Sequence, residues 1–288
     1  MAENAPFEWR AGGCDFKKRM SAFRVSTPHA RFGFNQWFAM KNLLRIACVI
    51  ACLSAGAAAS ENVFFDNTLL WLNYVGDHPI ADSPWGLHLE VQNRRADFGR
   101  DWQQLLIRPG VNYTLRPNLS VSAGWAYVKT YPYGNNAGAL EFPEQRAWQQ
   151  VLHTGRAFGL EWQNRLRLEQ RWIGEMKTAS DVENWRYENR LRYMVRTTLP
   201  LTENKKTYLA LWDEVFVNFG SNVAGNTFDQ NRAFVGVGRK LTDTTRVEFG
   251  FMEQTLQKRH TNSAKPQLWE NNHTISLWVL SKWPFGKG

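Results

Sequence analysis

Residues 160–172, with the sequence LEWQNRLRLEQRW, alternate between two faces of opposite chemistry. One face carries Glu161, Gln163, Arg165, Arg167, Glu169 and Arg171, and the other carries Trp162, Asn164, Leu166, Leu168, Gln170 and Trp172. Because side chains of a β-strand point alternately to opposite sides, this period of two predicts a strand. A strand that crosses lipid has about 9–11 tilted residues with aromatic side chains at both water interfaces. The aliphatic centre and terminal tryptophans of the second face therefore predict a transmembrane strand.

Strand-like segments recur along the rest of the chain. We expect strands near residues 67–75, 85–95, 102–115, 119–131, 145–154, 160–173, 184–199, 207–219, 229–241, 245–257 and 270–281. From residue 116 onward, short turns alternate with longer connections rich in Gly, Asn, Pro or Ser. Outer-membrane barrels alternate in this way, with short turns on the periplasmic side and longer loops outside. The pattern predicts an all-β fold, a transmembrane antiparallel up-and-down barrel.

The number of strands is less sharply defined by the pattern. Residues 85–281 contain ten segments that would close antiparallel, and residues 67–75 would form an eleventh. Single-chain bacterial barrels have even strand numbers. We therefore expect 10–12 strands, and either residues 67–75 are not a full wall strand or one further strand exists.

The charged faces must point into the lumen, because an arginine that faces lipid at the bilayer midplane costs about 2–4 kcal/mol. The charged residues predicted to line the lumen are Glu90, Arg94, Arg108, Glu161, Arg165, Arg167, Glu169, Arg171, Arg186, Glu188, Arg190, Arg192, Arg232 and Glu248. Trp162, Trp172 and Trp185 lie at strand ends and are predicted to form aromatic girdles. The adjacent Asp213 and Glu214 break the alternation, which predicts a bulge or a position near the rim.

The N-terminal region has the features of an export signal. Met40 is followed by Lys41, Arg45, an apolar run at residues 46–53 and the small residues Ala57, Ala58 and Ala59. This order is typical of a signal peptide, whose apolar run is too short to span a membrane. We interpret residues 1–39 as a mis-assigned extension, 40–59 as the signal peptide and 60–288 as a single barrel domain. The alternative is a genuine cytoplasmic extension before Met40.

Removal of residues 1–59 changes both the charge and the cysteine content. The chain has 35 basic and 26 acidic residues, and eight basic and three acidic residues precede residue 60, which leaves a net charge of +4 instead of +9. That balance is weak support for nucleic-acid binding, and we predict no nucleic-acid partner. Cys14, Cys48 and Cys52 all precede residue 60. We therefore predict no disulfide, no metal site and no cofactor.

Three short sequences accompany the strand pattern: RPGV at residues 108–111, EVFVN at 214–218 and FDQNR at 228–232. With them, the chain over roughly residues 65–281 resembles an uncharacterised bacterial family known as domain of unknown function 2490. The resemblance implies an exported outer-membrane barrel of a Gram-negative cell, in contact with membrane lipid and the barrel-assembly machinery. It implies no activity and no catalytic residue.

The arginine- and glutamate-rich lumen has two interpretations. A ring of arginines in a narrow pore would favour anions. Alternatively, the charges form an ion-paired plug, because a barrel of this size is only slightly wider than an eight-stranded one, which side chains just fill. The plug is the favoured interpretation. The predicted function is a structural role or porin-like, passive passage of small solutes through the narrow Arg- and Glu-lined lumen.

Two other function classes are considered. A lipid- or lipopolysaccharide-modifying hydrolase needs a nucleophile beside a base. His273 and Ser276 are three residues apart and would face opposite sides of a strand, and no Gly-x-Ser-x-Gly motif occurs, so the sequence favours no enzyme. A soluble periplasmic barrel that binds an apolar ligand would instead have an apolar interior. A Leu168→Arg substitution would be harmless on its polar exterior.

Overall fold

The fold was analysed in a computed structural model of the protein, which describes residues 62–135, 137–157, 159–259 and 266–285. The strands are β1 (Asn62–Pro79), β2 (Trp85–Ala96), β3 (Asp101–Arg116), β4 (Leu119–Thr130), β5 (Phe142–Ala157), β6 (Leu160–Met176), β7 (Val182–Pro200), β8 (Thr207–Phe219), β9 (Phe228–Lys240), β10 (Thr245–Gln257) and β11 (Gln267–Ser281). One 3-10 turn, η1 (Asp97–Gly99), joins β2 to β3. All eleven strand-like segments of the sequence are therefore strands. The predicted extension and signal peptide, residues 1–59, lie outside the described residues.

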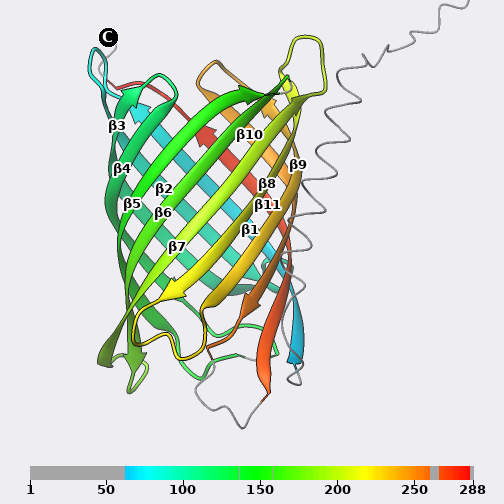
Figure 1. Ribbon diagram of the computed structural model, residues 1–288. Helices are drawn as coiled ribbons and strands as arrows, with labels where there is room; N and C mark the ends of the chain where they lie inside the picture. Colours follow the sequence, from blue (N-terminus) through cyan, green and yellow to red (C-terminus); the bar gives the residue numbers. More distant parts are fainter. Residues whose placement is uncertain (1–61, 136, 158, 260–265, 286–288) are drawn as a thin grey trace, which may run out of the picture.

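The strands form one closed barrel in which consecutive strands are neighbours (Figure 1). Each consecutive pair is antiparallel, whereas β1 and β11 close the barrel in parallel, from Asn62 opposite Gln267 to Gly76 opposite Ser281. The expectation of an even count closed antiparallel is thus wrong. β1 is a full wall strand, and the described residues contain no twelfth strand in the barrel. The physical reason is simple: when direction alternates along an odd number of strands, the first and last run the same way.

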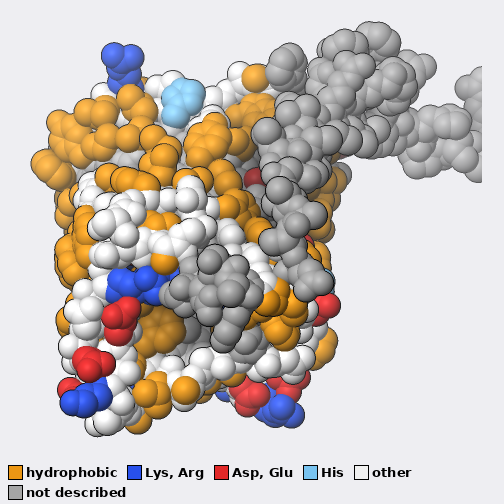
Figure 2. Space-filling view, turned by 60° about the horizontal axis from the view of Figure 1, so that its bottom comes forward, with side chains coloured by type: hydrophobic (Ala, Val, Ile, Leu, Met, Phe, Trp, Pro, Cys, Tyr) orange, Lys and Arg blue, Asp and Glu red, His pale blue; other side chains and the backbone are white. Residues whose placement is uncertain are grey.

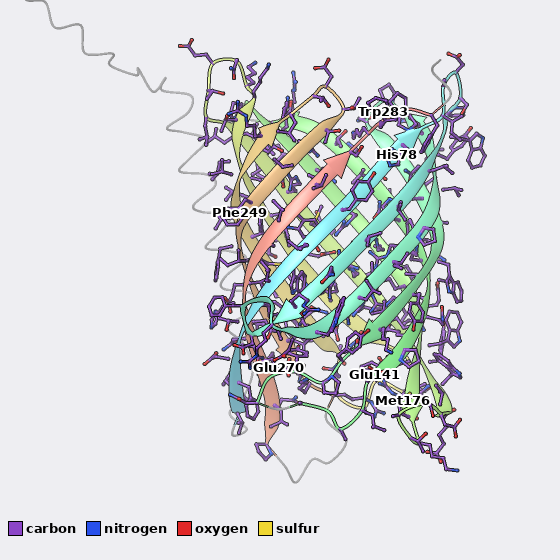
Figure 3. The ribbon with its side chains drawn as sticks, turned by 180° about the vertical axis from the view of Figure 1, so that it is seen from behind. His78, Glu141, Met176, Phe249, Glu270 and Trp283 are labelled. Atoms are coloured by element: carbon purple, nitrogen blue, oxygen red, sulfur yellow. The ribbon has the colours of Figure 1, made fainter. Side chains whose placement is uncertain are left out.

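The two ends of the barrel differ in their connections (Figure 1). At one end, which we call the turn end, residues 80–84, 117–118, 158–159, 201–206 and 241–244 join the strands. At the other, the loop end, the connections are residues 97–100, 131–141, 177–181, 220–227 and 258–266. The odd strand number places the start of β1 at the loop end and the end of β11 at the turn end. Figure 3 shows His78 and Trp283 at the turn end and Glu141 and Glu270 at the loop end.

The wall has apolar side chains on its outer face and most of its charged side chains on its inner face, where an apolar cluster around Trp71 is also buried. Outward positions include Leu166, Val237 and Phe249, which are 44%, 51% and 60% exposed, and Figure 2 shows hydrophobic side chains over much of the outer wall. Inward positions include Arg108 and Glu169, which are 1% and 0% exposed. This arrangement is the reverse of a soluble barrel with an apolar interior. It agrees with the faces expected from the period of two.

Paired glycines make room for large side chains inside the barrel. Gly110 of β3 lies opposite Gly124 of β4. A Cβ atom on Gly124 would lie 2.2 Å from the carbonyl oxygen of Pro109 and 3.0 Å from the ring of Trp148. The fully buried Trp148 therefore packs over a patch of wall that has no side chains of its own. Such an aromatic over facing glycines also fixes the local register.

Asp213 and Glu214 occupy regular positions in β8, opposite Ala233 and Arg232 of β9. The prediction of a bulge or a position near the rim is wrong, since both residues lie at the middle of β8 and the register shift lies between Phe216 and Val217. Glu214 points inward and is 2% exposed. Asp213 is half-buried on the opposite, outward side, where its two carboxylate oxygens accept hydrogen bonds from Asn231 at 3.0 and 3.1 Å. The strand therefore stays regular, and the side-chain amide of Asn231 on the neighbouring strand satisfies the outward carboxylate of Asp213.

Candidate functional site

Glu169 of β6 is the centre of a charged network inside the barrel. Its side chain is completely buried. Its Oε1 accepts hydrogen bonds from Arg108 Nη2 at 2.9 Å and Arg192 Nη1 at 2.8 Å. Its Oε2 accepts from Arg190 Nε at 2.9 Å and Nη2 at 2.5 Å. Glu169 is therefore held by three guanidinium groups, one from β3 and two from β7.

Each of these arginines also binds a second carboxylate. Arg108 Nη1 donates to Glu90 of β2 at 2.5 Å, and Arg190 Nη1 donates to Asp229 of β9 at 2.8 Å. Arg192 donates through Nε and Nη2 to Glu214 of β8 at 2.9 and 3.0 Å. Because β3 and β6 are not neighbours in the wall, the network crosses the lumen and ties opposite parts of the barrel together.

Two smaller clusters extend the network toward the ends. Nearer the loop end, Glu144 of β5 accepts from Arg146 Nε at 2.7 Å and from Arg171 Nε at 2.5 Å. Nearer the turn end, Glu248 of β10 is 1% exposed, pairs with Arg196 and accepts a hydrogen bond from the Tyr208 hydroxyl at 2.7 Å. Ion pairs thus occupy the lumen at several levels.

The structure brings most of the predicted lumen residues together. The buried members of the predicted set are Glu90, Arg94, Arg108, Arg167, Glu169, Arg171, Glu188, Arg190, Arg192, Arg232 and Glu248. Arg165 and Arg186 are half-buried and also paired, with Glu214 and Glu188 respectively. Glu161 is a correction: its side chain is 62% exposed at the turn end, where it pairs with Arg156 at 2.9 Å. Glu161 is on the inward side of the alternation, but it is the second residue of β6 and therefore lies at the rim, outside the closed part of the lumen.

Several members of the network were not predicted from the sequence. They are Glu144, Arg146, Arg196, Glu214, Asp229 and Glu270. Glu144 was missed because β5 begins at Phe142, before the expected start at residue 145. Asp229 and Glu270 are the first residues of the segments expected as strands, 229–241 and 270–281, where the alternation has too few residues to assign a face. Arg196 follows the same alternation as Arg190 and Arg192, so that signal was present.

The three predicted girdle tryptophans lie at the two ends of the wall. Trp172 is flanked on the outer surface by Trp125, with ring centroids 5.4 Å apart, and by Tyr187, also at 5.4 Å. Trp185, which is 43% exposed, lies near the start of β7 and also near the loop end. Trp162 is near the turn end, where its indole N–H donates to the carbonyl oxygen of Ala157 at 3.1 Å. The aromatic residues thus flank the aliphatic centre of the wall.

Two cavities remain in the lumen. One, of about 330 Å³, extends toward the turn end and is lined by residues that include His88, Arg167 and Glu248. The other, of about 260 Å³, extends toward the loop end and is lined by residues that include Arg94 and Tyr133. Both cavities are lined by Gln92, Arg192 and Arg232. These three side chains therefore stand between the two cavities.

The connection between β4 and β5 folds over the loop-end cavity. Its Tyr133 hydroxyl donates to Glu270 of β11 at 2.8 Å, and Glu270 also pairs with Lys258 at 2.5 Å. At the opposite end, the backbone N–H of Phe285 donates to the carbonyl oxygen of Pro79 at 2.9 Å. His78 Nδ1 lies 2.8 Å from the carbonyl oxygen of Trp283. The β4–β5 connection thus partly covers the loop end, and at the turn end the chain after β11 pairs with the end of β1.

The described histidines offer no assembled hydrolytic pair. His88 Nδ1 lies 2.7 Å from Asp77 Oδ1, and His273 Nδ1 lies 2.8 Å from Glu253 Oε2. Within the described part of the chain, the hydrogen bonds of His78, His88, His153 and His273 reach no serine or threonine hydroxyl. His260 lies outside the described residues. The same residues contain no cluster of three or more potential metal ligands, and none of their helices is long and apolar enough to cross a membrane.

Comparison with known proteins identifies the family of the chain. An uncharacterised protein of Methylorubrum extorquens is 30% identical over 239 residues, which cover 82% of this chain and 94% of that protein. No solved structure matches the chain. The family model described as protein of unknown function (DUF2490) matches residues 68–265, which includes the wall from β1 to β10 and all the charged residues around Glu169. The chain therefore belongs to the DUF2490 family.

Proposed function

We propose that this protein is an outer-membrane β-barrel whose lumen is closed by its ion-paired network. In this proposal the barrel has a structural role in the membrane, and passage of solutes is not its resting activity. The observation that carries the proposal is the inverted distribution of side chains: the wall is apolar outside and charged inside.

The outer wall fits a lipid environment. Large outward side chains such as Leu89, Val111 and Phe251 are 38%, 45% and 41% exposed. A contiguous exposed apolar surface of this kind is uncommon in soluble monomers and marks a surface that contacts protein or membrane. Aromatic residues near both ends match the girdles of outer-membrane barrels.

The lumen fits a closed state. Arg108, Arg167 and Glu169 are each at most 1% exposed, although they lie on inward faces of the wall. Breaking a buried ion pair is costly because it leaves an uncompensated charge. Opening a path through this layer would separate several such pairs at once. We therefore expect the network to hold the barrel shut and to stiffen its wall.

The experiment is a comparison of two arginine substitutions in the protein exported by a Gram-negative host. Leu168→Arg places a charge on the outward face of β6, and Thr178→Arg places the same charge in an exposed connection at the loop end. We expect the first to abolish recovery of folded protein from the outer-membrane fraction, because a lipid-facing arginine costs about 2–4 kcal/mol. Thr178→Arg should assemble like the wild type.

Equal recovery of both variants from the outer membrane would contradict the lipid-facing assignment. Recovery of both in a soluble periplasmic fraction would contradict the membrane location itself. A folded wild-type protein is recognised in these fractions by resistance to unfolding in cold detergent and by loss of that resistance after heating.

A further inference from the structure

Positive charge exceeds negative charge inside the described part of the barrel. The buried arginines are Arg94, Arg108, Arg146, Arg167, Arg171, Arg190, Arg192, Arg196 and Arg232. The buried carboxylates are Glu90, Glu144, Glu169, Glu188, Glu214, Asp229, Glu248 and Glu270. Arg165, Arg186 and Lys258, which are less buried, also pair with members of this carboxylate set. The carboxylates are therefore shared among more cations than they can neutralise.

The imbalance is concentrated at Arg94 and Arg232. Arg94, 7% exposed, binds only amide oxygens: its Nε donates to Gln92 at 2.9 Å and its Nη1 to Gln104 at 2.5 Å. Arg232, 6% exposed, donates through Nε to Gln230 at 3.0 Å. Neither guanidinium has a carboxylate within 4.0 Å among the described residues. Glutamine satisfies hydrogen bonds but carries no charge, so neither guanidinium has a carboxylate in direct contact within the described part of the chain.

The two arginines are also close to one another. The Cζ atom of Arg94 lies 3.9 Å and that of Arg232 5.0 Å from the centroid of the same Trp71 ring. The Cζ atoms of the two like-charged guanidinium groups are therefore at most about 8.9 Å apart. The indole face attracts each cation, but it does not neutralise either. Both side chains line the loop-end cavity of about 260 Å³.

We propose that this cavity is a binding site for a small oxyanion, which Arg94 and Arg232 hold by hydrogen bonds from their guanidinium groups. Buried charges are normally paired, and the planar guanidinium donates two parallel hydrogen bonds to carboxylate or phosphate groups. The cavity volume suits an ion the size of phosphate, sulfate or a short carboxylate. The β4–β5 connection lines the cavity on its outer side, so the ion enters from the loop end. This inference concerns the lumen and does not depend on where the barrel is located.

The test uses the full exported protein, folded in detergent, and inorganic phosphate as the probe. Phosphate is titrated by calorimetry at constant ionic strength, against chloride as the background anion. We expect saturable binding of one phosphate per barrel. Arg232→Gln should weaken it by at least about tenfold, because a charge-assisted hydrogen bond contributes about 1.5–3 kcal/mol. Arg156→Gln, which removes an arginine that is 81% exposed at the turn end, should bind phosphate like the wild type.

A second variant keeps the test decisive if Arg232→Gln does not fold. Gln104→Glu adds a carboxylate of almost the same shape beside Arg94, so the chain supplies its own counter-ion. The Thr130 hydroxyl, which accepts a hydrogen bond from the Gln104 amide at 2.7 Å, can turn to donate to the new carboxylate. We expect this variant to fold and to lose phosphate binding by at least about tenfold. Absence of phosphate and sulfate binding in the wild type would overturn the proposal. So would undiminished binding in the folded Gln104→Glu variant.

Discussion

Glu169→Gln tests the charged network at its most connected point. The substitution keeps the shape of the side chain and removes one negative charge from a group that is 0% exposed. Arg108, Arg190 and Arg192 approach this carboxylate at 2.5–2.9 Å. An amide can accept hydrogen bonds through one oxygen only, and its NH₂ group would face guanidinium donors. We therefore expect a large loss of stability.

The magnitude follows from burial. Removal of one partner of a buried ion pair costs about 3–5 kcal/mol. Because each of the three arginines retains a second carboxylate on another strand, we expect the lower end, about 3 kcal/mol. With a denaturant dependence of about 1–3 kcal/mol/M in urea, the unfolding midpoint would fall by about 1–3 M.

The assay is urea unfolding of the barrel in detergent micelles, followed by tryptophan fluorescence. Glu161→Gln is the matched control, since Glu161 forms an ion pair whose side chains are 62% and 81% exposed. Exposed pairs contribute about 0–1 kcal/mol, so its midpoint should barely move. A loss for Glu169→Gln no larger than that of Glu161→Gln would refute the assignment of Glu169 as the centre of the network.

Three further predictions concern the wall and its orientation. Asn231→Leu should destabilise the barrel by about 1–3 kcal/mol because it leaves the outward Asp213 carboxylate without its donor; combining it with Asp213→Val should restore the urea midpoint, and a double variant as weak as the single one would contradict this pairing. Gly124→Ala should lower the thermal midpoint of unfolding, because its Cβ would lie 2.2 Å from a carbonyl oxygen of the adjacent strand; an unchanged midpoint would show that the wall can relax there. A cysteine at Ser180, in a loop-end connection, should react with an impermeant maleimide in intact cells, whereas a cysteine at Asn204, in a turn-end connection, should react only after lysis. The opposite result would mean that the barrel has the reverse orientation in the membrane.

Much of the wall could be predicted from the sequence because its two faces differ so strongly. In β6 the inward face is charged and the outward face aliphatic with terminal tryptophans, so even one strand defines its own orientation. β1 was harder to delimit, because polar residues such as Asp66 and Asp77 flank its apolar centre. It was therefore expected as residues 67–75, although it extends from Asn62 to Pro79. The parallel pairing of β1 with β11 follows from the odd number of strands, and no short stretch of the sequence indicates it.

The charged site was predictable as a set of residues and not as a set of pairs. Alternation identifies Arg108 and Glu169 as inward-facing, but they meet across the lumen from strands that are not neighbours. That contact depends on the closure and stagger of the whole barrel, which no local sequence pattern contains. That Arg94 and Arg232 have no carboxylate in direct contact among the described residues becomes visible only after every other buried arginine has been assigned its carboxylate.

Current recording in planar lipid bilayers tests the closed lumen most directly. The exported wild-type protein is reconstituted, and its insertion is verified by the heat-dependent shift of the folded barrel on a gel. We predict no unitary current from the inserted wild type, because the buried ion pairs around Glu169 close the path between the two cavities. Steady current steps that favour anions, and that lose this preference in an Arg165→Glu/Arg190→Glu variant, would contradict the closed lumen and identify the barrel as an anion pore.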